Sequence, residues 1–243
     1  MTDIGGAALA GLAAGGALVL GAILAWTINV PRLVTTSVMA FGSGVLISAL
    51  SFDLVLEAQQ EGGLLATAAG FAAGALAYVL ANRALDRANA RNPRHLGGDP
   101  GTGLGIAIGA LLDGIPESAV LGLSMLGGQT VSIPVLTAII ISNLPEGLSS
   151  TAALKNSGRP ARYVFALWGG IALVSALASI GGLLLLQDVP PETTSFVTAI
   201  AAGAILAMIC DTMIPEAFQR THAATGLLAT GGFLLSFSIH LLP

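Results

Sequence analysis

The sequence predicts an all-α, polytopic membrane protein with eight transmembrane helices in an inverted-repeat bundle. Of its 243 residues 54% are hydrophobic and only 9% are charged, whereas a soluble domain needs roughly a quarter of its residues charged. Apolar stretches long enough for a span of about 20 residues recur along the chain. Two of them repeat the same Pro-Glu pair, which is typical of an inverted repeat. These observations exclude a soluble globular fold.

The apolar stretches divide one transmembrane domain, residues 1–243, into eight helices and seven loops. The helices are expected near 4–26, 35–57, 63–85, 104–126, 131–154, 162–187, 193–218 and 225–242. The first stretch lacks the basic residues of a cleaved signal sequence, so we expect it to remain as a helix. The longest loop, 86–103, contains His95 and is expected to be a cytoplasmic connector. The single cysteine, Cys210, excludes an intramolecular disulfide.

The basic residues set the orientation, because Lys and Arg concentrate in short cytoplasmic loops. All nine fall on one side, namely Arg32, Arg83, Arg87, Arg91, Arg94, Lys155, Arg159, Arg162 and Arg220. The alternate loops carry Glu61, Asp188 and Glu192 instead. One span more or fewer would move the later basic residues to the other side. The pattern therefore supports eight spans with both termini outside.

Several acidic residues lie inside the predicted spans, where an aspartate costs roughly 2.5 to 3.5 kcal/mol on insertion scales and usually has a function. They are Asp53, Glu57, Asp113, Glu117, Glu146, Asp211 and Glu216. We expect Asp53 and Glu57, late in the second span, at an entrance vestibule or a solvated helix end, and Glu216 at the inner boundary. Asp211 either reaches a metal site or solvates the backbone that Pro215 leaves free.

The fourth and fifth spans carry a near repeat, residues 113–118 (DGIPES) and 142–147 (SNLPEG). Each proline lacks an N–H and clashes with the carbonyl four residues back, so a backbone carbonyl is freed. At membrane depth such backbone is tolerated only where it lines a cavity or meets protein partners. The repeat therefore predicts a polar site between the two helices.

The polar side chains of this repeat have helical spacing. Asp113 and Glu117 are four residues apart, and Asn143 and Glu146 are three apart, so each pair shares one helical face. If the two helices are neighbours, four oxygen-bearing side chains converge near the midplane. A bound dication would keep the carboxylates ionised there.

These motifs resemble those of the ZIP (ZRT/IRT-like) metal transporters, whose members have eight helices with both termini outside. Their fourth helix carries His-Asn-x-Pro-Glu-Gly, and their fifth carries His-x-x-Pro-Glu. The resemblance implies that Glu117 and Glu146 are bridging metal ligands and that Asn143 is a polar ligand. The run 210–216 (CDTMIPE) is similar to the family's helix 7 segment, which implies a place for Asp211 at the site.

The motif departs from the family pattern at positions that bear on the metal. Asp113 stands where the helix 4 histidine usually is, Gly114 replaces the asparagine, and Ser142 replaces the helix 5 histidine. The resulting all-oxygen set suits Mn²⁺, Fe²⁺ or Mg²⁺ better than Zn²⁺, although zinc is the family default. We expect a transported divalent metal (Zn, Mn, Fe or Cd) and no other cofactor. The resemblance implies uptake into the cytoplasm by alternating access.

Other interpretations stay open. Glu117 and Glu146 could cap kinks or pair with other helices, and Asp113 and Asn143 could make helix contacts. An intramembrane aspartyl protease would use two aspartates sharing a proton, but residues 109–113 lack its Gly-x-Gly-Asp pattern. A metal sensor without transport would keep the same site.

The expected surroundings are those of a transporter in the cell membrane. Besides the metal ion, we expect the lipid bilayer as partner and no nucleic acid, and a homodimer is compatible with these expectations. His222 is too isolated to argue for a metal cluster. His240, near the outer end of the last helix, is expected to be interfacial.

Overall fold

The described part of the chain is helical throughout. The computed structural model describes residues 4–91 and 103–241. Its α-helices are α1 (Ile4–Thr27), α2 (Arg32–Ala49), α3 (Leu56–Arg91), α4 (Gly103–Leu123), α5 (Ile133–Asn156), α6 (Ala161–Leu186), α7 (Pro191–Met208), α8 (Ile214–Thr221) and α9 (Ala224–His240). Two π-helical segments, η1 (Leu50–Val55) and η3 (Ile209–Met213), and a 3-10 turn, η2 (Leu126–Gly128), join them. The predicted all-α class is confirmed.

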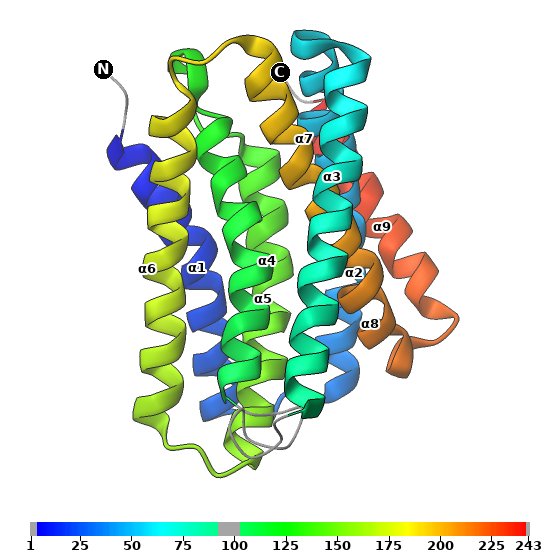
Figure 1. Ribbon diagram of the computed structural model, residues 1–243. Coiled ribbons are helices and arrows are strands. Elements are labelled where there is room, and N and C mark those ends of the chain that lie inside the picture. The colour runs from blue at the N-terminus through cyan, green and yellow to red at the C-terminus, as the bar shows by residue number, and fades with distance from the viewer. Residues whose placement is uncertain (1–3, 92–102, 242–243) are drawn as a thin grey trace.

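Six helical stretches among the described residues are long and apolar enough to cross a membrane. They are Ile4–Thr27, Arg32–Arg87, Gly105–Leu123, Ile133–Asn156, Ala161–Leu186 and Pro191–Thr221. The second stretch has 56 residues and folds back on itself, so that α2 and α3 run in opposite directions (Figure 1). Its backbone leaves helical geometry at Gly63, with φ 78° and ψ 167°, values open to glycine because it has no Cβ. Helix α9 is apolar but has only 17 residues.

The connection between α3 and α4 differs from the predicted loop 86–103. Helix α3 continues to Arg91, six residues beyond the predicted helix end at 85. The alanines and arginines of residues 86–91 favour a helix whatever the solvent, so the end of the apolar sequence does not end the helix. His95 lies outside the described residues.

The helices pack in two groups. The first group consists of α1, α4, α5 and α6, in which α1 packs on α5 and α6 and α4 packs on α6. The second group consists of α2, α3, α7, α8 and α9, with α3 packed on α7 and α2 packed on α8 and α9. Figure 1 shows the two groups side by side. They meet along a seam where α2 contacts α5 and α4 contacts α7.

Glycines bring the helices of the second group into close contact. A Cβ at Gly44 of α2 would lie 1.8 Å from the carbonyl oxygen of Ala229, and one at Gly232 of α9 would lie 2.0 Å from that of Phe41. No side chain fits at such distances, so α2 and α9 touch backbone to backbone. This is the small-residue packing typical of membrane helices.

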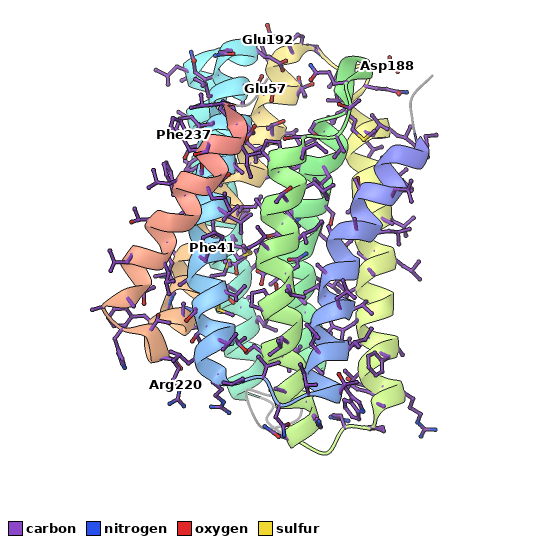
Figure 2. All side chains as sticks on the ribbon, turned by 180° about the vertical axis from the view of Figure 1, so that it is seen from behind. Phe41, Glu57, Asp188, Glu192, Arg220 and Phe237 are labelled. Carbon is purple, nitrogen blue, oxygen red and sulfur yellow. The ribbon has the colours of Figure 1, made fainter. Side chains whose placement is uncertain are left out.

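Charged side chains separate toward the two ends of the helix bundle. In Figure 2, Glu57, Asp188 and Glu192 lie at one end and Arg220 lies at the other. The first turn of α1 and the last turn of α9 both lie at the acidic end (Figure 1). We refer to the end with Glu57, Asp188 and Glu192 as the acidic end and to the end with Arg220 as the basic end.

Candidate metal-binding site

Both Pro-Glu motifs lie inside continuous helices, with Pro116 in α4 and Pro145 in α5. Glu117, which follows the first proline, is 1% exposed. Its Oε2 atom is buried and has no hydrogen-bond partner among the described residues. Burial of a carboxylate oxygen without a partner is costly, so Glu117 is the most unusual polar group on α4.

Asp113 lies one turn before Glu117 and has a partner from another helix. The hydroxyl of Tyr78, on α3, donates a hydrogen bond to Asp113 Oδ1 over 2.9 Å. Tyr78 is 6% exposed, and Thr212 of η3 lies close enough to interact with the same hydroxyl. One oxygen of Asp113 is therefore held while the other is open to a further partner.

Asn143 presents an amide on the facing helix α5. It is 2% exposed, and its Nδ2 donates to the carbonyl oxygen of Ala14 on α1 over 2.9 Å. Because the nitrogen makes this bond, the amide oxygen is the atom left to accept from or coordinate another group. Asn143 thus makes its helix contact through the nitrogen, so the structural and the ligand interpretations of this residue are compatible.

Glu146 lies close enough to the other carboxylates to interact with them electrostatically. It lies within electrostatic reach of Asp113, Glu117 and Glu216, and its side chain is partly buried. Three acidic side chains from α4 and α5 therefore share one region of the protein interior. Among the described residues, however, no group of three or more His, Cys, Asp or Glu side chains is arranged closely enough to hold a metal ion.

Asp211 does not share this burial. It lies on η3 with an exposed side chain, as does its neighbour Cys210. A π-helical segment holds one residue more per turn than an α-helix, which rotates the residues after it. That rotation is a physical reason why the spacing of residues 210–216 did not fix the direction of the Asp211 side chain.

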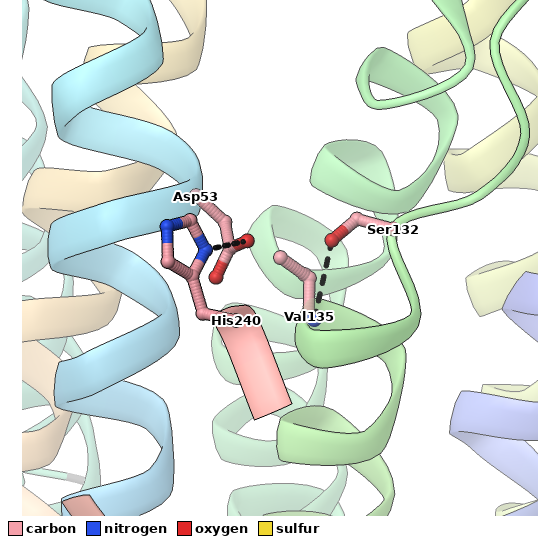
Figure 3. A network of polar contacts seen from close by, with 4 residues as sticks. All are labelled: Asp53, Ser132, Val135 and His240. Carbon is pink, nitrogen blue, oxygen red and sulfur yellow. Dashed lines mark hydrogen bonds and ion pairs between the residues drawn. The ribbon is translucent and has the colours of Figure 1, made fainter. Parts of the chain in front are cut away.

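The structure pairs Asp53 with His240, two residues that no sequence pattern connects. Nδ1 of His240, in the last turn of α9, lies 3.0 Å from Oδ1 of Asp53 on η1 (Figure 3). The other Asp53 oxygen is buried without a hydrogen-bond partner among the described residues. Asp53 therefore has a side-chain partner on α9 and lies apart from Glu117. His240 makes this contact in addition to its place near the end of the helix.

Figure 3 also shows the start of α5, where Ser132 Oγ accepts a hydrogen bond from the Val135 N–H over 3.4 Å.

A cavity of about 410 Å³ opens at the acidic end. Its lining includes Glu57, Glu61 and Thr198, and it reaches down to Val120 on α4. Val120 is three residues after Glu117, so one residue of the cavity lining is one helical turn from the buried carboxylate.

A second cavity, of about 240 Å³, lies toward the basic end, where Arg32 and Arg220 line it together with Glu216. Ser149 of α5 also lines it, and its hydroxyl donates to Glu216 Oε1 over 2.6 Å. Ser149 is three residues after Glu146. The two cavities thus lie toward opposite ends of the bundle, and each has in its lining a residue one turn after Glu117 or Glu146.

Comparison with known proteins identifies a relative. No family model matches the chain. An Arabidopsis thaliana protein named "Putative zinc transporter" is 30% identical over 182 residues, which cover 73% of this chain and 29% of the plant protein. The match supports the ZIP assignment. The chain spans less than a third of the length of this relative. Together with the apolar helices, the match supports an integral membrane protein.

The positions that depart from the ZIP motif have other partners in the structure. Ser142, in place of the helix 5 histidine, is buried and donates its hydroxyl to the carbonyl oxygen of Ile139 over 2.9 Å. Asp113, in place of the helix 4 histidine, accepts from Tyr78. Oxygen atoms therefore stand where the ZIP pattern has imidazole nitrogens, and Tyr78 is a contact that the motif alone does not indicate.

Proposed function

We propose that this chain moves divalent metal cations across the membrane and binds them through Asp113, Glu117, Asn143 and Glu146. The observation that carries the proposal is the burial of Glu117 with an oxygen that lacks a partner among the described residues. Such a group is expensive in a membrane interior. A bound dication supplies the opposite charge. It therefore offsets the free-energy cost of burying the Glu117 carboxylate, and this offset favours metal binding. The relative's name, a zinc transporter, is consistent with this role and with a protein that is not an enzyme.

The two cavities supply a route to and from these residues. The ion enters the outer cavity beside Glu57 and Glu61, passes Val120, and is held by the carboxylates of α4 and α5. It leaves past Ser149 and Glu216 into the inner cavity. Buried apolar side chains, among them Val120, Leu121 and Ile139, pack beside the site, so passage requires helix movement. Alternating access meets that requirement.

Eight spans are part of this proposal. The stretch Arg32–Arg87 contributes two spans because it folds back at Gly63, and α9 contributes the last one. Helix α9 at about 1.5 Å per residue approaches the thickness of the hydrocarbon core, and its end is extended by Leu241. The full chain then forms a single transmembrane domain, residues 1–243.

An inverted repeat is supported by reciprocal glycine contacts. The α2 and α9 pair is joined through Gly44 and Gly232. The α7 and α3 pair is joined in the same way, because a Cβ at Gly203 would lie 1.9 Å from the carbonyl oxygen of Phe71 and one at Gly74 would lie 1.9 Å from that of Ile200. In each of the four helices, the glycine and the residue whose carbonyl meets the partner helix's glycine are three positions apart. We infer that α2 and α9 correspond to α7 and α3.

The π-helical segments support the same correspondence. Helices α2 and α7 each have 18 residues and are each followed by a π-helical segment, η1 or η3, that carries one aspartate. The two helices run in opposite directions: α2 leads toward Glu57 at the acidic end, and α7 leads from Glu192 there toward Arg220 (Figure 2). Matching features on antiparallel spans are expected of an inverted repeat.

The substrate is zinc, as in the name of the plant relative, a harder ion such as Mn²⁺ or Fe²⁺, or the softer ion Cd²⁺. The proposed ligands are all oxygen atoms, which favours manganese and iron. Asp211 is left out of the set because its side chain is exposed. We place the basic end in the cytoplasm, which puts both termini outside a cell membrane and makes transport uptake. A homodimer is compatible with this arrangement.

Reconstituted uptake tests the proposal. Purified protein in liposomes is expected to take up at least one of Zn²⁺, Mn²⁺, Fe²⁺ and Cd²⁺ with saturable kinetics. Glu146→Gln keeps the side-chain size and removes the charge, so uptake should fall by about 10- to 100-fold. The matched control is Glu192→Gln, an exposed carboxylate at the acidic end that does not line the cavity, which should retain most of the activity.

The alternatives predict different results. A metal sensor would bind the ions in solution but give no flux in correctly inserted, folded protein. A Glu146→Gln variant with wild-type flux would exclude this residue from the transport route.

The metal preference depends on Asp113. Asp113→His restores an imidazole at this position, and nitrogen ligands favour Zn²⁺ over Mn²⁺. The ratio of zinc to manganese uptake should rise by about tenfold, by analogy with the effect of ligand surroundings on metal affinity. Competition between the two ions in the liposome assay measures this ratio, with Asp188→His at the acidic end as the control. An unchanged ratio in an active variant would mean that Asp113 is not a ligand.

A further inference from the structure

Tyr78 occupies an unusual position between the two helix groups. It belongs to α3, which packs on α7 within the second group, and its hydroxyl bonds to Asp113 on α4 of the first group. A buried phenol usually needs a hydrogen-bond partner. Here the partner is a proposed metal ligand on the other side of the seam. No feature of the Pro-Glu motifs predicts this contact.

A hydrogen bond to one oxygen of a carboxylate fixes the orientation of the other. Tyr78 donates to Asp113 Oδ1 over 2.9 Å, which leaves Oδ2 to coordinate a cation. Groups that hold metal ligands in this way commonly contribute 10- to 100-fold to metal affinity. Building on the transport function proposed above, we propose that Tyr78 is a positioning residue that orients Asp113 for the metal and makes metal affinity depend on how the two helix groups are aligned.

Because the Tyr78–Asp113 hydrogen bond crosses the seam, it depends on the relative position of the two helix groups. A hydrogen bond is lost when its donor and acceptor move apart by about 1 Å, so a slide of α4 along α3 would separate Tyr78 from Asp113. Asp113 would then lose the group that orients it, and the metal would be held less tightly. The same movement that opens the route would therefore weaken the site and favour release.

Tyr78 has a second acceptor within its own helix group. Thr212 of η3 lies close to the phenol, and the Thr212 hydroxyl donates its own hydrogen to the carbonyl oxygen of Met208 over 2.6 Å. The Thr212 oxygen is thus able to accept from Tyr78. The phenol need not remain unpaired when Asp113 departs, which lowers the cost of breaking the bond across the seam.

Metal binding to the purified full chain tests the role of Tyr78. Tyr78→Phe removes only the hydroxyl, and we expect the dissociation constant for Mn²⁺, measured by the loss of the free-ion EPR signal, to rise about tenfold. KM for Mn²⁺ uptake should rise with it. The control is Tyr163→Phe on α6, where the ring lies beside Arg159 at a distance of 5.1 Å; it should leave both values unchanged.

A double-mutant cycle separates positioning from general stability. In the Asp113→Asn background, Tyr78→Phe should change the dissociation constant by less than about twofold, because the oriented carboxylate is already gone. A tenfold loss in both backgrounds would mean that the substitution only loosens the fold and would overturn the proposal. Wild-type Mn²⁺ affinity in Tyr78→Phe would also overturn it while leaving the transport function intact. If the wild-type protein neither binds nor moves any tested ion, the transport function itself fails.

Discussion

Glu117→Gln is expected to reduce metal uptake by about 100-fold or more. Loss of groups that merely surround a ligand already costs 10- to 100-fold in metal affinity, and Glu117 is proposed as a ligand itself. Its side chain is 1% exposed, so water cannot replace the missing charge. Liposome uptake measures the effect.

The same substitution should make the metal-free protein more stable. Glu117 Oε2 is buried without a partner among the described residues, and keeping a carboxyl group there without its metal, either ionised or at the cost of taking up a proton, destabilises the fold. Gln has the same size and no charge. The thermal unfolding midpoint in detergent without metal should therefore rise while activity is lost, which is the trade-off expected where a fold retains a costly group for function.

Glu192→Gln is the control for both measurements, because Glu192 lies exposed at the acidic end (Figure 2). It should change neither flux nor midpoint appreciably. If Glu117→Gln lowered the midpoint instead, Glu117 would be making a contact that stabilises the fold. Its burial would then no longer argue for a bound cation.

The helices could be predicted from the sequence because their signals are local, and the metal site between α4 and α5 stays a prediction. Apolar length sets the spans, and Glu117 and Glu146 stand out because a carboxylate in such a span is costly. The end of α3 was predicted less well. The apolar sequence ends near residue 85, but the segment to Arg91 remains helical by intrinsic propensity.

The contacts between distant segments had no local signal. Asp53 and His240 are 187 residues apart, and Tyr78 resembles any aromatic residue of an apolar span until its partner Asp113 is known. The π-helical segment η3, which carries Asp211, is a further feature without a local signal. Such features depend on tertiary packing, which one sequence without its fold does not specify.

Gly44→Ala should be among the most destabilising single substitutions in the chain. The added Cβ would lie 1.8 Å from the carbonyl oxygen of Ala229, and backbone cannot move aside as a flexible side chain can. Overpacking typically costs about 1–3 kcal/mol and occasionally more, and a clash with backbone belongs at the upper end. Helices α2 and α9 would have to separate, which should appear as a lower unfolding midpoint in detergent and reduced folded yield.

Gly226→Ala is the matched control on α9, because no atom lies within 4 Å of its added Cβ. It should have no cost and could gain up to about 1 kcal/mol from helix propensity. A midpoint that fell equally in both variants would mean that any alanine in this helix pair is destabilising, regardless of close contact.

Gly203→Ala extends the test to the inverted repeat. Its Cβ would lie 1.9 Å from the carbonyl oxygen of Phe71, so the clash between α7 and α3 matches the clash between α2 and α9. If the two helix pairs are equivalent, Gly203→Ala and Gly44→Ala should lower the midpoint by similar amounts, and both should impair uptake without touching a proposed ligand. A large loss for Gly44→Ala with none for Gly203→Ala would show that the two interfaces contribute differently, which would argue against their correspondence.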